Sequence, residues 1–224
     1  MIIGSLHIST ENYIYKITNF IKCHDHPLFS PMLQCFPLKS TYKLPSDQLY
    51  CSEFITSLPE FIQMKSFTIH HATKLLYSIY YQIHFLFENN IAISFIDLQD
   101  IMVIDGVYFY FCNCNKLYNI KKNNCFVITD CYDTSNPFLP PEFQKNTIMP
   151  FSTLSTSVYY SLAVIILYCL HTGNKKRTIN NPTNHLLSKS EYLSFLQKYR
   201  HTKLYHTLLL CLMEDPIERK LILF

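Results

Sequence analysis

Apolar residues recur every three or four positions between Ile69 and Asn89, with polar residues filling most of the intervals. This spacing predicts an amphipathic helix, which the polar pair Asn89-Asn90 would end. A shorter helix is expected to open within Ser57–Ile62. The apolar positions that define the longer helix are Leu75, Leu76, Ile79, Ile83, Leu86 and Phe87.

β-Branched and aromatic residues fill Ile101–Phe111 on both sides of Asp105-Gly106. Asp-Gly provides the positive φ angles of a two-residue turn, so this segment predicts a β-hairpin. Lys116–Ile128 is expected to add a second short hairpin. The proline-rich stretch Asn136–Glu142 predicts a loop.

A long uncharged stretch, Phe151–Leu170, contains the strongly apolar run Val158–Leu170. It predicts a buried helix from about residue 154 to 171, ended by Gly173. A membrane span is the alternative, because twenty uncharged residues precede the basic cluster Lys175-Lys176-Arg177. The many Ser and Thr residues in its first half favour the buried helix, so no membrane span is expected.

Two amphipathic helices are predicted at Ser190–Tyr199 and Thr202–Glu214, after a polar segment. Before residue 50 the chain has four prolines, and Asn12–Ile21 favours only one or two strands. The predicted fold class is therefore α+β and mainly helical. Residues 1–50 would form a reduced β region or irregular segment, and residues 51–224 a helical lobe with a small β-hairpin.

Composition narrows the classes of function. Hydrophobic residues make up 49% of the chain and charged residues 16%, against roughly 25% charged in a typical domain. We expect a compact chain whose apolar surface binds a protein partner. The net charge of +3 comes without a long basic run, so nucleic acid is not an expected ligand. With three glycines, the chain contains neither of the common glycine-rich phosphate loops.

The nine cysteines are scattered through apolar stretches, and no secretory signal opens the sequence. We therefore expect reduced, buried thiols in an intracellular, cytoplasmic protein. Metal binding is the alternative, either by Cys112-x-Cys114 with Cys125-x5-Cys131 or by Cys23–His26. Neither set has the spacing of a recognised zinc site, so no metal is expected.

Four segments follow the order of motifs in the C-terminal lobe of a protein kinase: Asn90–Asp105, Pro140-Pro141-Glu142, Ser161–Leu170 and Asp215–Arg219. The kinase counterparts are the catalytic loop H-R-D-L-K-P-E-N with its hairpin, A-P-E, the buried helix that begins D-x-W-S-L-G, and a late arginine after Asp-Pro. The chain thus resembles the protein kinase-like superfamily as a degenerate C-lobe, or pseudokinase, of the kind found in large DNA viruses. The resemblance implies a kinase-like C-lobe over residues 51–224 and a location in the cytoplasm, or in the host cytoplasm or virion if the chain is viral.

The resemblance also assigns positions in the catalytic loop. Phe95 falls at the catalytic base, Asp97 at the loop lysine, and Asp100 at the metal-binding asparagine. A shifted register makes Asp97 the base and moves Met102 to the asparagine position. Asn113, which opens Asn113-Cys114-Asn115, stands where D-F-G has its aspartate, and a neutral amide is a poor magnesium ligand.

These departures imply a protein that has lost phosphoryl transfer, needs no cofactor, and acts as a binding or scaffolding module. The resemblance implies that Glu142 and Arg219 form the structural ion pair that joins the A-P-E glutamate to the late arginine in kinases. Lys16 is the nearest match to the lysine that kinases place in their N-terminal lobe.

Two alternatives stay open. One is an active atypical Ser/Thr-type kinase that uses ATP and magnesium, with Asp97 or Asp100 in the active site. It predicts that the carboxylates of Asp97, Asp100 and Asp105 gather around a metal in a cleft. The other is a membrane-associated helical protein that uses Phe151–Leu170.

Overall fold

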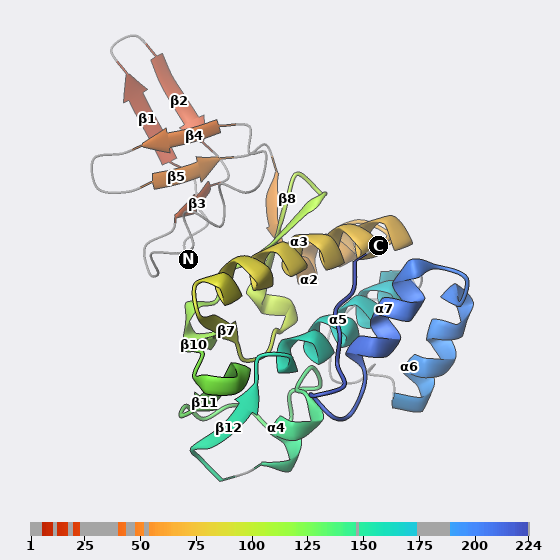
Figure 1. Ribbon diagram of the computed structural model, residues 1–224. Helices are drawn as coiled ribbons and strands as arrows, with labels where there is room; N and C mark the ends of the chain where they lie inside the picture. Colours follow the sequence, from red (N-terminus) through yellow and green to blue (C-terminus); the bar gives the residue numbers. More distant parts are fainter. Residues whose placement is uncertain are drawn as a thin grey trace.

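The computed structural model describes residues 54–146, 148–173 and 189–223, together with five strands between residues 6 and 51 (Figure 1). The described residues form an α+β fold that combines helices with several small sheets. The predicted fold class is confirmed at this level. The polar segment after Gly173 lies outside the described residues.

The strands before residue 52 form two small antiparallel sheets. In the first, β1 (Leu6–Thr10) pairs with β2 (Tyr13–Ile17). In the second, β5 (Gln48–Cys51) lies between β3 (Phe20–Lys22) and β4 (Ser40–Lys43). The prediction of one or two strands was therefore too low, because very short strands depend on hydrogen bonds to partners that a local pattern does not reveal. The four prolines of this region lie outside the described residues.

Two helices follow, and both were predicted. Ser57 caps α2 (Leu58–Met64) by accepting a hydrogen bond from the Glu60 backbone N–H, while the Glu60 carboxylate accepts from the Ser57 N–H. Thr68 and His71 form the same reciprocal cap at the start of α3 (Ile69–Glu88). Such capping boxes satisfy backbone donors that a helix start leaves unpaired.

The predicted first hairpin is also present. β8 (Ile101–Ile104) pairs with β9 (Tyr108–Phe111) on one side and with β6 (Ile55–Ser57) on the other. Its turn holds three residues and not two, because Ile104 pairs with Tyr108. Asp105 and Gly106 adopt positive φ angles of 52° and 72°, as an Asp-Gly turn requires.

The predicted second hairpin is wrong, although its strands exist. β10 (Leu117–Asn119) pairs with β7 (Ile91–Ile93), and β11 (Cys125–Ile128) pairs with β12 (Phe151–Leu154). Asn123 and Asn124, both with φ of 58°, redirect the chain between the two strands. Periodicity identifies strands but does not state which distant segment supplies their hydrogen bonds.

The apolar helix is α5 (Ser157–Gly173), which begins three residues later than predicted because Phe151–Leu154 forms β12. Twelve of its residues are buried, as the prediction of a core helix required. No helix among the described residues is both long enough and apolar enough to span a membrane. The predicted loop Asn136–Glu142 ends early, because Pro141 opens the short helix α4 (Pro141–Lys145).

The last two helices complete the core. α6 (Lys189–Leu196) continues into a 3-10 turn at Gln197–Tyr199, and α7 (Lys203–Cys211) ends three residues earlier than predicted. Figure 1 shows α5 running between α3 and these two helices, all of which contact it. Gly173 is needed at the end of α5, because a Cβ there would lie 2.6 Å from the backbone of Phe67.

Gln82 joins α3 to the open edge of the hairpin. β9 is an edge strand, so its outer backbone groups have no strand partner among the described residues. The Gln82 amide donates to the Phe109 carbonyl, and its oxygen accepts from the Phe111 N–H, both at 2.8 Å. Because all three residues are buried, the side chain replaces a neighbouring strand where water cannot reach.

We expect Gln82→Leu to lower the free energy of unfolding by about 2–3 kcal/mol, because it leaves a buried carbonyl and a buried N–H unsatisfied. Urea denaturation measures this loss. Gln63→Leu on the exposed face of α2 is the matched control, and should change stability by less than about 0.5 kcal/mol. Equal losses in the two variants would show that Gln82 does not stabilise the edge.

Candidate functional site

The candidate site lies where the hairpin brings two loops together. Ile101 pairs with Phe111, so the residues just before β8 and just after β9 become neighbours. Asp100 ends the 3-10 turn Leu98–Asp100, and Asn113 begins the turn Cys114–Lys116. A backbone hydrogen bond of 2.9 Å from the Cys112 N–H to the Asp100 carbonyl holds the two loops in register.

The Asp100 carboxylate is buried and has a partner for each oxygen. Oδ1 accepts a hydrogen bond from Nδ2 of Asn113 at 2.7 Å. Oδ2 lies 2.5 Å from Nζ of Lys116 and also accepts from the Asp97 backbone N–H at 2.7 Å. One ammonium and two N–H donors therefore occupy the carboxylate, and all three contacts are charge-assisted.

Lys116 provides a cation inside the site. Its ammonium group lies 4.0 Å from the centre of the Phe95 ring, in addition to its ion pair with Asp100. An ammonium over an aromatic face is attracted by the ring quadrupole, most strongly when water is scarce. The Lys116 side chain is 16% exposed and that of Asp100 only 5%, so the pair is largely shielded.

Phe95 itself belongs to a small hydrophobic cluster. Its ring packs against Phe143 and Tyr132, at centroid distances of 5.6 and 6.2 Å. The same cluster contains Phe126 of β11 and Ala92 of β7. Phe95 is therefore a core side chain, and a hydrocarbon ring can neither accept nor donate a proton.

The other two acidic residues expected at a metal have different partners. Asp97 accepts a hydrogen bond from Nδ2 of Asn136 at 2.7 Å. Asp105 lies in the hairpin turn and accepts from the Phe54 backbone N–H at 3.3 Å. In the described part of the chain, no group of three or more His, Cys, Asp or Glu side chains could hold a metal ion. The gathering of Asp97, Asp100 and Asp105 predicted for an active kinase is therefore not observed.

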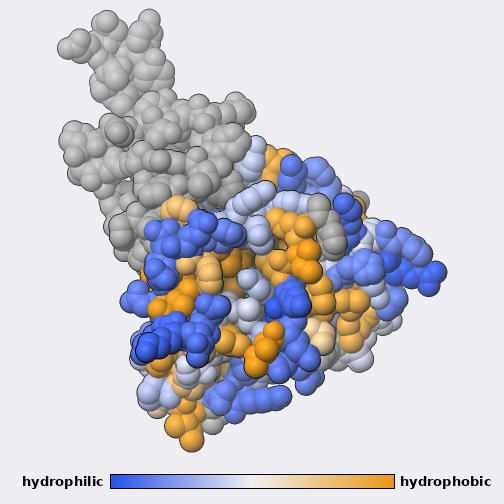
Figure 2. Space-filling view, viewed as in Figure 1, coloured by the Kyte–Doolittle hydropathy of each residue, from blue (hydrophilic) through white to orange (hydrophobic). Residues whose placement is uncertain are grey.

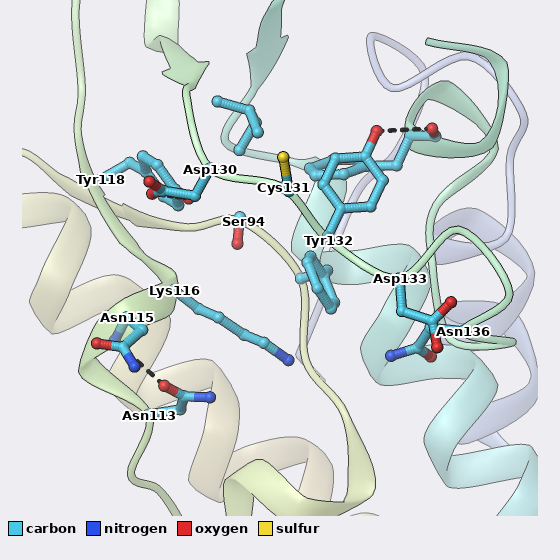
Figure 3. A pocket seen from close by; sticks show the side chains of 13 residues that line it. Ser94, Asn113, Asn115, Lys116, Tyr118, Asp130, Cys131, Tyr132, Asp133 and Asn136 are labelled. Atoms are coloured by element: carbon cyan, nitrogen blue, oxygen red, sulfur yellow. Dashed lines mark hydrogen bonds between the residues drawn. The ribbon is translucent and has the colours of Figure 1, made fainter. Parts of the chain in front are cut away.

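A cavity of about 570 Å³ opens beside Lys116 (Figure 3). One side is formed by Ser94, Phe95 and the turn that carries Asn113 and Lys116. The segment from Asp130 to Asn136 forms the other side. Figure 3 shows the Lys116 side chain reaching between these two sides.

Hydrogen bonds fix the Asp130–Asn136 side of the cavity. The Tyr132 hydroxyl lies 2.8 Å from the Phe143 carbonyl and 2.9 Å from the Asn146 carbonyl. Burial raises the pKa of Tyr132, so the phenol stays protonated and can donate. The Tyr118 hydroxyl donates to Asp130 at 3.0 Å, and burial together with that carboxylate raises the pKa of Tyr118 to about 12.

Glu142 and Arg219 form a second, separate cluster. Their side chains make a two-pronged ion pair, with Nη1–Oε1 and Nη2–Oε2 distances of 2.6 and 2.7 Å. Arg219 also donates to the backbone carbonyls of Met213 and Glu214 and lies against the ring of Tyr160. The ion pair expected from the sequence is thus present, and it ties α4 to the C-terminal segment.

Sequence reasoning found some of these residues and missed others. Asp100 and Asn113 were both singled out, and the structure brings them into contact. Lys116 and Asn136 were missed; the nearest signal was the position of Lys116 three residues after Asn113. Lys16 lies in β2, and its side chain is outside the described residues, as is the Cys23–His26 set.

No family model matches this chain, and comparison with curated proteins gives no match. Any assignment of function therefore depends on the residues of the site and their contacts.

Proposed function

We propose that this chain is a catalytically inactive, protein kinase-like protein that works as a binding or scaffolding module. Its support is the order of the segments that resemble kinase motifs, combined with contacts that fill the expected catalytic positions. The described order is a long helix, a loop, a hairpin, a short helix at Pro-Pro-Glu, a buried helix and a late arginine.

The contact between Asp100 and Asn113 carries the proposal. In a kinase, an asparagine of the catalytic loop and the aspartate of D-F-G hold magnesium together. In this chain the acid and the amide stand at exchanged positions, and the Asn113 amide donates directly to Asp100. Lys116 then supplies the positive charge at the second carboxylate oxygen. A metal would have to displace an ammonium that is already paired and shielded.

The catalytic base is also lacking at its expected position. Phe95 packs in a hydrophobic cluster, and Asp97, the alternative base, is held by Asn136. Phosphoryl transfer depends on metal, positioning and a carboxylate near the attacking hydroxyl. These contacts remove two of those three contributions.

Features outside the site support a role in binding. Several large apolar side chains are exposed, with Ile148 at 82% and Ile217 at 75%. Figure 2 shows hydrophobic surface interleaved with hydrophilic surface on one face of the molecule. Apolar surface of this kind is common where proteins meet partners. None of the six cysteines among the described residues forms a disulfide, and only Cys169 and Cys211 are buried, so the expectation of buried thiols is wrong for the other four.

Thermal unfolding with and without ATP, each with and without magnesium, tests the loss of catalysis. We expect no shift in Tm in any combination, because the site holds its own cation. A ligand present at a hundred times its Kd would stabilise the fold by about 2.7 kcal/mol, which is a shift of several degrees. An active kinase measured in parallel is the positive control. A magnesium-dependent shift, or phosphate transfer that Asp100→Asn abolishes, would contradict the proposal.

A further inference from the structure

The cavity beside Lys116 has an excess of negative charge. Its lining includes the carboxylates of Asp130 and Asp133 and the ammonium of Lys116. Lys116 is already paired with Asp100, which lies outside the lining, so the two remaining carboxylates set the sign of the charge that a ligand meets. The ion pairs found among the described residues involve neither Asp130 nor Asp133.

Both aspartates are accessible from solvent. Hydrogen bonds from the Ser135 hydroxyl and N–H lower the pKa of Asp133. The Tyr118 hydroxyl donates a hydrogen bond to Asp130 at 3.0 Å. Both side chains are exposed at the rim, so a ligand can reach them without a rearrangement of the protein.

Aromatic rings line the same cavity. Tyr118, Tyr132, Phe95 and Phe143 all contribute to its walls. In Figure 3, Asp130 lies beside Tyr118 and Asp133 beside Asn136, with the Tyr132 ring between the two aspartates. A cavity lined by both carboxylates and aromatic rings can attract a planar cation by charge and by stacking.

The cavity is formed before any ligand arrives. Tyr132 is hydrogen-bonded to α4 and its end, and Asn136 to Asp97. Pairing of β11 with β12 fixes the strand that leads into this segment. A volume of about 570 Å³ lies within the usual range of ligand sites, and a preformed wall reduces the entropy that binding costs.

We propose that this cavity binds an arginine side chain of an extended, basic segment in a partner protein. The inference rests on the proposed binding function and specifies its partner class. Arginine fits better than lysine, because its planar fork can meet a carboxylate with two hydrogen bonds while it stacks on a ring. The Asn115 amide in the lining is available to hydrogen-bond the backbone of such a segment.

Fluorescence anisotropy tests the proposal on the full-length chain. The probe is a short fluorescein-labelled peptide with two central arginines in a glycine-serine background. We expect saturable binding that weakens with added salt, and a loss of about tenfold in affinity for Asp130→Asn and for Asp133→Asn. Glu88→Gln is the matched control; it removes one exposed carboxylate on α3, outside the lining, and should leave binding unchanged.

Three further probes identify the chemistry. A peptide with citrulline in place of arginine keeps the shape without the charge, and should bind at least tenfold more weakly. A lysine peptide should lie between the two. Free arginine amide should compete poorly, because it lacks the flanking backbone. Equal binding of the arginine and citrulline peptides, equal loss in Glu88→Gln, or competition by arginine amide as strong as by the peptide would each overturn the proposal.

Failure of peptide binding can be distinguished from failure of the proposed loss of catalysis. If the arginine peptide does not bind and ATP with magnesium gives no thermal shift, the partner class is wrong while the loss of catalysis stands. If the peptide binds and is phosphorylated, the proposed loss of catalysis fails and the cavity is a substrate site. Thermal unfolding of both aspartate variants confirms that they are folded, which is expected for exposed side chains.

Discussion

Glu142→Ala is expected to lower the free energy of unfolding by about 3–5 kcal/mol, the range for breaking a buried ion pair from one side. The Arg219 side chain is 0% exposed, so its guanidinium would lose a two-pronged partner without gaining water. The two backbone carbonyls it also contacts would remain, which places the expected loss toward the lower end of the range. Denaturant unfolding followed by fluorescence or circular dichroism measures it.

A double-mutant cycle measures the interaction energy between Glu142 and Arg219 apart from the other contacts of each residue. Arg219→Met alone should also destabilise strongly, and the double variant should cost clearly less than the sum of the single changes. Glu88→Gln provides the matched exposed pair, since Glu88 contacts His84 on the surface of α3. That change should cost less than about 1 kcal/mol. A coupling energy near zero between Glu142 and Arg219 would show that the ion pair does not hold α4 in place.

This ion pair was within reach of sequence reasoning, as were the helices. The spacing of apolar residues in Ile69–Asn89 identifies α3 because a helix repeats its buried face every 3.6 residues. The uncharged run ending at Leu170 identifies α5 because only a core or a membrane accepts such a stretch. Glu142 and Arg219 match the A-P-E glutamate and the late arginine of kinases, so the resemblance implied their pairing across 77 positions of separation.

Strand pairing and the details of the site were not predictable in the same way. β10 and β11 have the composition of a hairpin, yet each pairs with a strand elsewhere in the chain. The contact of Lys116 with Asp100 depends on the register of the β8–β9 hairpin and on the 3-10 turn after it. Such contacts arise from tertiary geometry, and no local pattern marks a lysine that will point inward.

The contact between Asp100 and Asn113 was predictable from the sequence only in part. The sequence identified both residues as departures from the kinase pattern. Only the structure shows that the two departures compensate each other, because the amide of one now donates to the carboxylate of the other. Protein groups therefore satisfy both oxygens of the Asp100 carboxylate.

Lys116→Met tests how much the ammonium of Lys116 stabilises the buried Asp100 carboxylate. The change keeps the unbranched chain as far as the fourth side-chain atom and removes the ammonium from a carboxylate that is only 5% exposed. We expect a loss of about 3–5 kcal/mol in the free energy of unfolding at neutral pH. Lys121→Met, at an exposed position, is the control and should change stability by less than about 0.5 kcal/mol.

The double variant Lys116→Met/Asp100→Asn distinguishes the cost of a stranded charge from the cost of lost packing. Removing both charges should recover most of the lost stability, since a neutral pair leaves no charge stranded. Mg²⁺ or Mn²⁺ should stabilise the single variant, where Asp100 is unpaired, but neither the wild type nor the double variant. If the ion stabilises the wild type equally, the ammonium of Lys116 does not exclude a cation from Asp100. If the double variant is as unstable as the single one, the cost comes from lost packing against Phe95 and not from the charge of Asp100.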